Sequence, residues 1–355
     1  LQLALAGVVE NPPADSLRPI VYEGDAAAAY ILDEKTKGSG TKGAINIILD
    51  IGGGTTDVAI WDNGAEPKQL LSVSLRLAGG DFFTGHIMAN PEILEDFGLK
   101  AWSTVIKQLN QESEAELKSN LHYIGELLFS GKALDNAIER EWSRISDTDN
   151  VRVLKETAYV FLGGVAWFVG RHLRNLIRDG KLPKEALGDI AVALCGRGSG
   201  LFARLHGKDP FAQTDISKIM LLIAAAAGEA RPRYPQVQVS PVPKIEVAAG
   251  MIIGARDDSR PRPSAPAEGT AGISFFDEEP VADLNADGSS DAVYSAMPLD
   301  IGIEDLDEFL KAFARVSGFT LTIDENQRAK LINGVADIDR EDDRDGRPRQ
   351  SEFAA

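Results

Sequence analysis

The sequence predicts an α/β fold, and three observations support this prediction. Residues 1–256 alternate short β-branched runs with longer helical patterns, an order typical of α/β proteins. Two of the apolar runs are followed by clustered glycines, which predicts buried strands that end in tight turns. From residue 257 the sequence becomes acidic, with prolines and little periodicity, so we expect the α/β domain to end near residue 256.

Composition and charge limit the class of protein. The chain has 355 residues, 44% of them hydrophobic and 26% charged, which predicts a globular protein of two or three domains. The net charge is −17, and residues 257–355 hold 23 acidic and 10 basic side chains, so the acidity lies mainly in the C-terminal part. This balance argues against binding to nucleic-acid phosphates or to anionic membranes, and we expect neither partner.

The cysteine count and the hydropathy pattern predict a cytoplasmic protein. Cys195 is the single cysteine, which excludes an internal disulfide and a cysteine-based zinc site and favours a reducing compartment. The longest apolar stretch, residues 158–170, is shorter than the roughly 20 residues that span a bilayer, so we expect no membrane insertion. Residues 1–9 are apolar but lack the basic start and cleavage site of a signal peptide.

The first predicted elements are two strands joined by a glycine turn. Residues 45–50 form an apolar run that ends in Asp50, and residues 58–61 form a second run. The sequence Gly-Gly-Gly-Thr-Thr, residues 52–56, lies between them. We therefore expect a β-hairpin here and not a strand–turn–helix unit.

Helical patterns dominate the middle of the chain. Residues 91–185 are predicted to be mainly helical, and residues 189–195 have the pattern of a buried strand, followed by Gly196, Gly198 and Gly200. Individual helices are predicted at residues 112–130, 151–179, 217–230 and 246–255.

The C-terminal part is predicted to contain less structure. Helical spacing is present at residues 303–316 and 325–335, with Phe309 and Phe313 on one face. Two uses of this aromatic face remain open, namely the core of a local hairpin, which we favour, and the docking of a partner. The predicted segments are an acidic disordered linker at 257–298, a small helical hairpin at 299–338 and a polar tail at 339–355.

The glycine turn after Asp50 has a clear chemical use. Glycines allow backbone N–H groups to approach a phosphate closely, threonine hydroxyls add donors, and a carboxylate at a strand end can hold a metal-bound water. The alternative is an ordinary hairpin with a glycine turn. Three consecutive glycines alone do not decide between the two.

The surrounding sequence favours the phosphate-binding alternative. LDIGGGTTDVAIW, residues 49–61, closely resembles the second phosphate-binding hairpin of the actin, heat-shock chaperone and sugar-kinase ATPase superfamily. Four further segments resemble parts of that family in the same order, which is more specific than any one motif. They are EGDAAAAY (23–30), similar to the helix before the hairpin, AGGDFF (78–83), similar to the turn after it, ALCGRGSG (193–200), similar to the adenosine loop, and PKIEVAAGMIIG (243–254), similar to the closing helix.

This resemblance implies a two-lobed, ribonuclease-H-like fold of the actin type, with nucleotide between the lobes. Residues 1–256 would form the nucleotide-binding domain, with the second lobe mostly complete and a helical subdomain at about residues 84–188. The family's first phosphate hairpin, Asp-x-Gly-Thr, has no counterpart, and only about 22 residues precede Glu23. We therefore expect an N-terminally truncated member or a degenerate one, and Leu1 in place of Met favours truncation.

The resemblance also implies roles for individual residues around ATP or ADP and Mg²⁺. Asp50 would orient a magnesium-bound water, Asp57 would assist at the cation, and Glu23 would help to position the attacking water. In the intact protein the reaction would be phosphoryl transfer to water, accelerated by positioning and charge stabilisation. The β- and γ-phosphates would be held by Gly52, Gly53, Gly54, Thr55 and Thr56.

The ribose and the adenine would contact two further segments. Arg197 stands where relatives usually have glycine. Its guanidinium could stack on adenine, face a phosphate or lie in solvent, and the sequence leaves these alternatives open. The residues concerned are Gly79 and Gly80 near the ribose, and Gly196, Arg197, Gly198 and Ser199 against the adenosine.

Three functions are consistent with these motifs. The first is a chaperone-like ATPase, in which nucleotide-driven closure of the lobes is coupled to a protein client or co-factor protein; residues 78–83 favour it, because they are closer to chaperones than to actins. The second is an actin-like, filament-forming ATPase, which makes self-association a further expectation. The third is a nucleotide-free interaction scaffold. Residues 257–355 contain no run of strands like a chaperone substrate domain, so a chaperone of this kind would be divergent.

Overall fold

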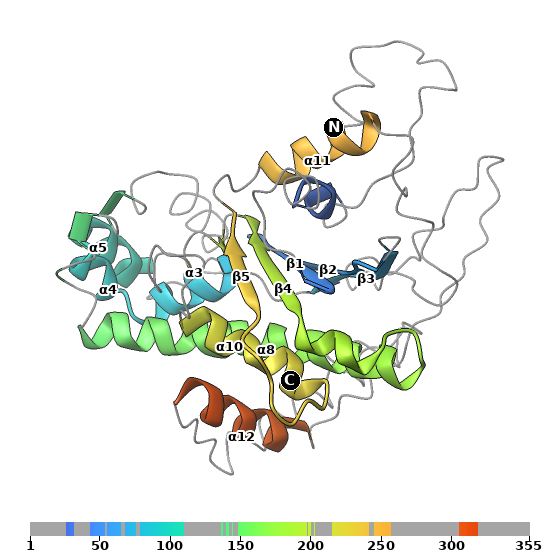
Figure 1. The fold of residues 1–355 in the computed structure, drawn as a ribbon. Helices are drawn as coiled ribbons and strands as arrows, with labels where there is room; N and C mark the ends of the chain where they lie inside the picture. The colour runs from blue at the N-terminus through green and yellow to red at the C-terminus, as the bar shows by residue number, and fades with distance from the viewer. Residues whose placement is uncertain are drawn as a thin grey trace, which may run out of the picture.

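The structure is a computed structural model, shown in Figure 1. Its described residues form a mixed α/β arrangement, with helices on both sides of one sheet. The α/β class predicted from the sequence is confirmed at this level. The residues that the structure describes are 26–31, 43–53, 55–64, 68–75, 79–109, 148–196, 215–240, 245–256 and 305–318, with single residues between 136 and 144 and between 198 and 202.

The sheet is mixed and has five strands. They are β1 (Ile45–Ile51), β2 (Thr56–Asp62), β3 (Lys68–Leu75), β4 (Ile190–Cys195) and β5 (Gln236–Val239). Their order across the sheet is β3-β2-β1-β4-β5. β2 runs antiparallel to β1 and β3, whereas β1, β4 and β5 are parallel. The carboxyl ends of β1 and β4 therefore lie at the same edge of the sheet.

Alternate side chains of β1 face two separate cores. Ile47 and Leu49 belong to the main core, whereas Ile48 packs on the other face against the helical residues 26–31. All seven residues of β1 are buried, as in a strand covered on both faces. Because successive side chains alternate, Asp50 lies on the same face as Ile48.

The described helices surround this sheet. α8 and α10 lie on one side of it, and α11 lies on the other (Figure 1). The helices are α3 (Gly79–Ala89), α4 (Ile93–Asp96), α5 (Lys100–Leu109), α8 (Asp149–Arg178), α10 (Asp215–Ala226), α11 (Ile245–Arg256) and α12 (Asp305–Ser317), with a 3-10 helix at Lys184–Gly188.

α8 is the central helix of the main core. Within the described ranges it is the one helix long and apolar enough to cross a membrane, by length and composition alone. However, 67% of its most apolar 18-residue stretch is buried inside the protein, as in a core helix. α10 packs so closely on it that a methyl group at Gly170 would overlap the carbonyl oxygen of Ile223.

α12 forms a further layer on the outer side of α8 and α10 (Figure 1). Phe313 is fully buried there, and Phe309 packs edge-on against Trp167 with ring centroids 5.8 Å apart. The aromatic face identified in the sequence therefore contacts the α/β domain. Residues 325–335, the expected second helix of the hairpin, lie outside the described residues.

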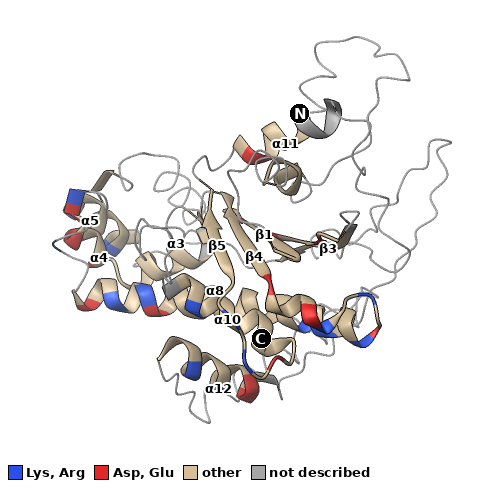
Figure 2. Ribbon diagram, viewed as in Figure 1, with Lys and Arg blue, Asp and Glu red and all other residues tan. Residues whose placement is uncertain are grey.

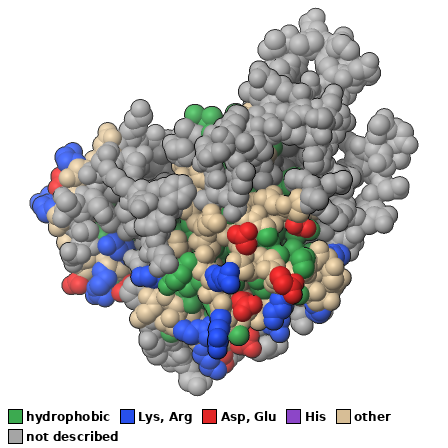
Figure 3. Space-filling view, viewed as in Figure 1, with side chains coloured by type: hydrophobic (Ala, Val, Ile, Leu, Met, Phe, Trp, Pro, Cys, Tyr) green, Lys and Arg blue, Asp and Glu red, His purple; other side chains and the backbone are tan. Residues whose placement is uncertain are grey.

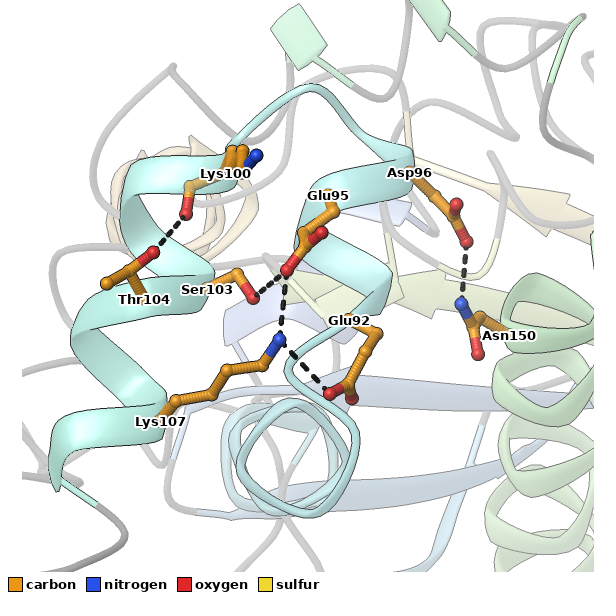
Figure 4. A network of polar contacts seen from close by, with 8 residues as sticks. All are labelled: Glu92, Glu95, Asp96, Lys100, Ser103, Thr104, Lys107 and Asn150. Carbon is orange, nitrogen blue, oxygen red and sulfur yellow. Dashed lines mark hydrogen bonds and ion pairs between the residues drawn. The ribbon is translucent and has the colours of Figure 1, made fainter.

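A polar network joins the short helices α4 and α5 (Figure 4). Glu95 Oε1 accepts hydrogen bonds from Ser103 Oγ and Lys107 Nζ, both at 2.9 Å, and Lys107 also pairs with Glu92 at 3.2 Å. The hydrogen bond from Lys107 lowers the pKa of the Glu95 carboxyl. Exposed pairs of this kind add little stability. Charged residues lie mainly on the helices, including α8, whereas the strands carry few (Figure 2).

Most predicted elements are present, and three differ. The strands predicted at 45–50, 58–61 and 189–195 are β1, β2 and β4. β3 and β5 were not predicted, and the segment 78–83, interpreted as a turn, contains the start of the helix α3 at Gly79. The helix predicted at 112–130 lies outside the described residues.

Candidate functional site

The candidate site lies where β1 and β4 end. Their parallel register places Asp50 beside Cys195. The glycines that follow the two strands therefore emerge side by side, Gly52 after β1 and Gly196 after β4. In open α/β sheets, ligands bind outside the carboxyl ends of such strands.

Two carboxylates meet across the β1–β2 hairpin. Asp50 is directly opposite Asp57 in the antiparallel register, which brings their Cβ atoms to about 5 Å on one face. Asp50 is buried, with 8% of its surface exposed, and Asp57 is half-buried. Like charges this close repel each other, so a cation near both carboxylates would offset that repulsion.

The turn between β1 and β2 presents its backbone to solvent. The N–H of Gly52 donates to the carbonyl oxygen of Thr55 at 2.8 Å and so closes the turn. Gly53 is exposed, and among the described atoms none lies within 4 Å of the position that its Cβ would take. Thr55 is half-buried and Thr56 is fully buried. The tip is therefore small and accessible, as a backbone contact with phosphate requires.

Glycines from two other segments contact the end of β1. A Cβ on Gly79 would lie 2.8 Å from Ile51 Cγ2 and 3.3 Å from the Cα of Gly198. A Cβ on Gly198 would lie 2.7 Å from Ile51 Cγ2 and 2.9 Å from its carbonyl oxygen. Only residues without a side chain allow this approach. The hairpin, the start of α3 and the loop after β4 therefore meet around Ile51.

Gly196 brings the loop after β4 against Asp50. Its φ is +77°, a conformation that favours glycine. A methyl group at this position would overlap Asp50 Oδ1 and would lie 2.5 Å from the carbonyl oxygen of Ile51. The backbone of this loop thus forms one wall beside the Asp50 carboxylate.

Ser199 and three aromatic rings stabilise this loop. The Ser199 hydroxyl is buried and donates to the carbonyl oxygen of Gly196 at 2.6 Å. The Ser199 hydroxyl proton is therefore used within the loop and is not available to a ligand. Phe202 stacks on Phe161 of α8, with centroids 5.4 Å apart, and on Phe82 of α3, with centroids 6.2 Å apart. One aromatic cluster thus anchors both the loop and α3.

The first turn of α3 adds a favourable environment for anions. The first N–H groups of a helix lack partners within it, and the helix dipole is positive at this end. α3 begins at Gly79, which contacts Ile51 and Gly198, so its first turn is adjacent to the glycine hairpin. A helix N-terminus beside a glycine turn is a favourable place for a phosphate.

The structure brings together most of the residues predicted for the site. Ile51, Phe82, Phe161 and Phe202 were not predicted; Phe82 is close in sequence to Gly79, whereas the other three carry no local signal. Glu23, Gly54 and Arg197 lie outside the described residues, and their roles stay predictions. Gly80 follows Gly79 in α3. The predicted residues found around the end of β1 are Asp50, Gly52, Gly53, Thr55, Thr56, Asp57, Gly79, Gly196, Gly198 and Ser199.

The carboxylates of Asp50 and Asp57 are few, which suits a metal ion that is also bound by water and phosphate. Across the part of the chain that the structure describes, no three His, Cys, Asp or Glu side chains gather as a metal-binding group. Mg²⁺ is commonly held by one or two carboxylates together with water and substrate phosphates. Asp50 and Asp57 therefore suit a Mg²⁺ ion that also binds water and substrate phosphates.

Comparison with protein-family models finds no matching family, and comparison with curated proteins finds no match either. Similarity therefore assigns no function to this chain. Its function is inferred below from the residues of the site.

Proposed function

We propose that the chain binds ATP or ADP with Mg²⁺ at the end of β1, as a divergent member of the actin, heat-shock chaperone and sugar-kinase superfamily. The observation that carries this proposal is the contact of three segments around Ile51. Each of them resembles a different nucleotide-binding motif, and they are far apart in the sequence. An ordinary glycine hairpin would not require that contact.

The strand order supports a ribonuclease-H-like domain. The order β3-β2-β1-β4-β5, with β2 alone antiparallel to the rest, is the arrangement expected of such a domain. The nucleotide would bind at the carboxyl ends of β1 and β4, beside the helix α3. This is also where the glycine segments lie.

Asp50 and Asp57 would hold the magnesium ion, directly or through water. Mg²⁺ would neutralise part of the phosphate charge. The backbone at Gly53 and the first N–H groups of α3 would contact the phosphates. Gly196 and Gly198 would let the adenosine approach the loop backbone closely.

We favour a chaperone-like ATPase, in which nucleotide binding is coupled to a protein partner. The likeness of residues 78–83 to the chaperone turn supports this choice, and α3 begins within that turn. The actin-like alternative shares the hairpin motif and differs in predicting filaments. ATP hydrolysis would also use Glu23.

Titration with a fluorescent ATP analogue tests the proposal. We expect saturable, micromolar binding that requires Mg²⁺ and is displaced by ATP and ADP more effectively than by AMP, because the phosphate contacts dominate. Absence of saturable binding would refute a nucleotide site and favour the scaffold. ATP-dependent pelleting in the ultracentrifuge would favour the actin-like alternative over the chaperone-like one.

A further inference from the structure

A second surface, separate from the nucleotide site, lies beneath α12. α12 covers the side of α8 and α10 that faces away from the sheet (Figure 1). It contacts this side through an aromatic pair four residues apart, Phe309 and Phe313. Most residues of the main core lie in α8, α10 and the strands, and Ala312 and Phe313 of α12 join the same buried cluster.

The surface contains a notch filled by Phe313. Gly163 lies inside α8, where glycine is unfavourable for helix stability. A Cβ on Gly163 would lie 2.9 Å from Cδ2 and 3.0 Å from Cε2 of Phe313, so the ring occupies the space of the missing side chain. Leu222 of α10 borders the same space, with Cδ1 3.3 Å from that Cβ position. The Phe313 ring therefore fills the space between α8 and α10 at this point.

The contacts continue along one ridge of α8. Trp167, four residues after Gly163, packs against Phe309, and Arg171, four residues further, lies 4.0 Å from Glu308. Residues four apart lie on the same face of a helix. The ridge on α8 thus meets an acidic residue followed by two aromatic residues on α12, in antiparallel orientation.

Several features make this contact weak. Among the described residues of α12, only Ala312 and Phe313 are buried. Trp167 Nε1 is buried without a hydrogen-bond partner in the part of the protein that the structure describes, which is unfavourable. The pair between Arg171 and Glu308 is long, and Glu308 is exposed. On the lower face of the molecule, charged side chains of both signs lie among hydrophobic ones (Figure 3).

We propose that this face of α8 and α10 is a helix-binding site, and that α12 is its tethered, releasable ligand. A helix as short as α12 is marginal in water without a partner surface, so it folds where it docks. Release of α12 exposes the notch at Gly163 with Trp167 and Leu222. A partner helix with an acidic residue followed by two aromatic residues four apart then competes for the same site.

Cleavage of the chain between α11 and α12 tests this proposal. A protease recognition sequence is inserted between residues 280 and 281, and the protein is purified intact and then cut. We expect the α/β domain to keep its cooperative thermal unfolding. The C-terminal fragment should dissociate on dilution and rebind, when labelled, with a micromolar Kd.

Two substitutions in α12 make the test specific. Phe313→Ala should weaken rebinding about 30-fold or more, because it empties the notch. Lys311→Ala, an exposed position on the same helix, should change the Kd less than about 2-fold. Loss of the domain's cooperative unfolding after cleavage, or a fragment that excess unlabelled fragment cannot displace, would show that α12 is an integral part of the core. Equal effects of the two substitutions would also overturn the proposal.

Discussion

Replacement of Gly196 by alanine tests how the nucleotide site is assembled. At a φ of +77° an L-residue costs about 1–2 kcal/mol. The methyl group would also overlap Asp50 Oδ1 and would lie 2.5 Å from the carbonyl oxygen of Ile51, and overpacking costs about 1–3 kcal/mol more. We therefore expect Gly196→Ala to lower the free energy of unfolding by about 2–5 kcal/mol.

Gly180→Ala is the matched control for this substitution. Its φ is +69°, and among the described atoms none lies within 4 Å of its Cβ position, so only the backbone penalty of about 1–2 kcal/mol applies. Urea unfolding followed by circular dichroism measures both variants. Gly196→Ala should also weaken Mg²⁺-ATP binding, because Asp50 must move, whereas Gly180→Ala should not. Equal destabilisation and equal affinity would refute the contact between the loop after β4 and Asp50.

Three further predictions concern stability and are measured by urea or thermal unfolding. Burial lowers the pKa of His172 from 6.5 to about 3, so only the unfolded chain gains a proton as the pH falls, and the free energy of unfolding should drop by about 2 kcal/mol between pH 7 and pH 5. His172→Leu should remove this part of the pH dependence. If the free energy of unfolding of this variant still fell as steeply between pH 7 and pH 5, the prediction would be contradicted. Gly170→Ala should destabilise by about 2 kcal/mol, because its methyl group would overlap Ile223, whereas Gly164→Ala on the same helix has open space and should stabilise by about 0.5–1 kcal/mol. If both substitutions changed the free energy of unfolding in the same direction, the packing of α10 on α8 would be wrong. Ser199→Ala should cost about 1–3 kcal/mol, because a buried carbonyl loses its donor, and an unchanged melting temperature would refute that role.

The sequence predicts the central strands well and the edge strands poorly. β1 and β4 are buried on both faces, so their sequences are nearly continuous apolar runs that can be recognised locally. In β3 the adjacent Leu70 and Leu71 are both buried, because the register with β2 shifts between Ile60 and Trp61. This irregularity breaks the alternation on which strand prediction depends. β5 has only four residues and gives a weak signal.

The same limit applies to the candidate site and to α12. Asp50 and the glycines were predicted because their residue types suit a phosphate and a cation. The contact of these glycines at Ile51 depends on the parallel pairing of β1 with β4. The two strands are far apart in the sequence, so no local sequence pattern predicts their pairing. The amphipathic pattern of α12 shows that one face is covered, but the notch at Gly163 is visible only in the folded chain.

The most direct test of the proposed function is calorimetric titration of the chain with Mg²⁺-ATP, compared between Asp50→Asn and Asp62→Asn. Asp62 ends β2 at the opposite end of the same hairpin, where its Oδ1 accepts a hydrogen bond from the N–H of Gly64 at 3.0 Å. We predict micromolar binding by the unsubstituted chain, a loss of about 10–100-fold or more for Asp50→Asn, and less than about 2-fold change for Asp62→Asn. No binding by the unsubstituted chain, or equal affinities for the two variants, would contradict a nucleotide site at the end of β1.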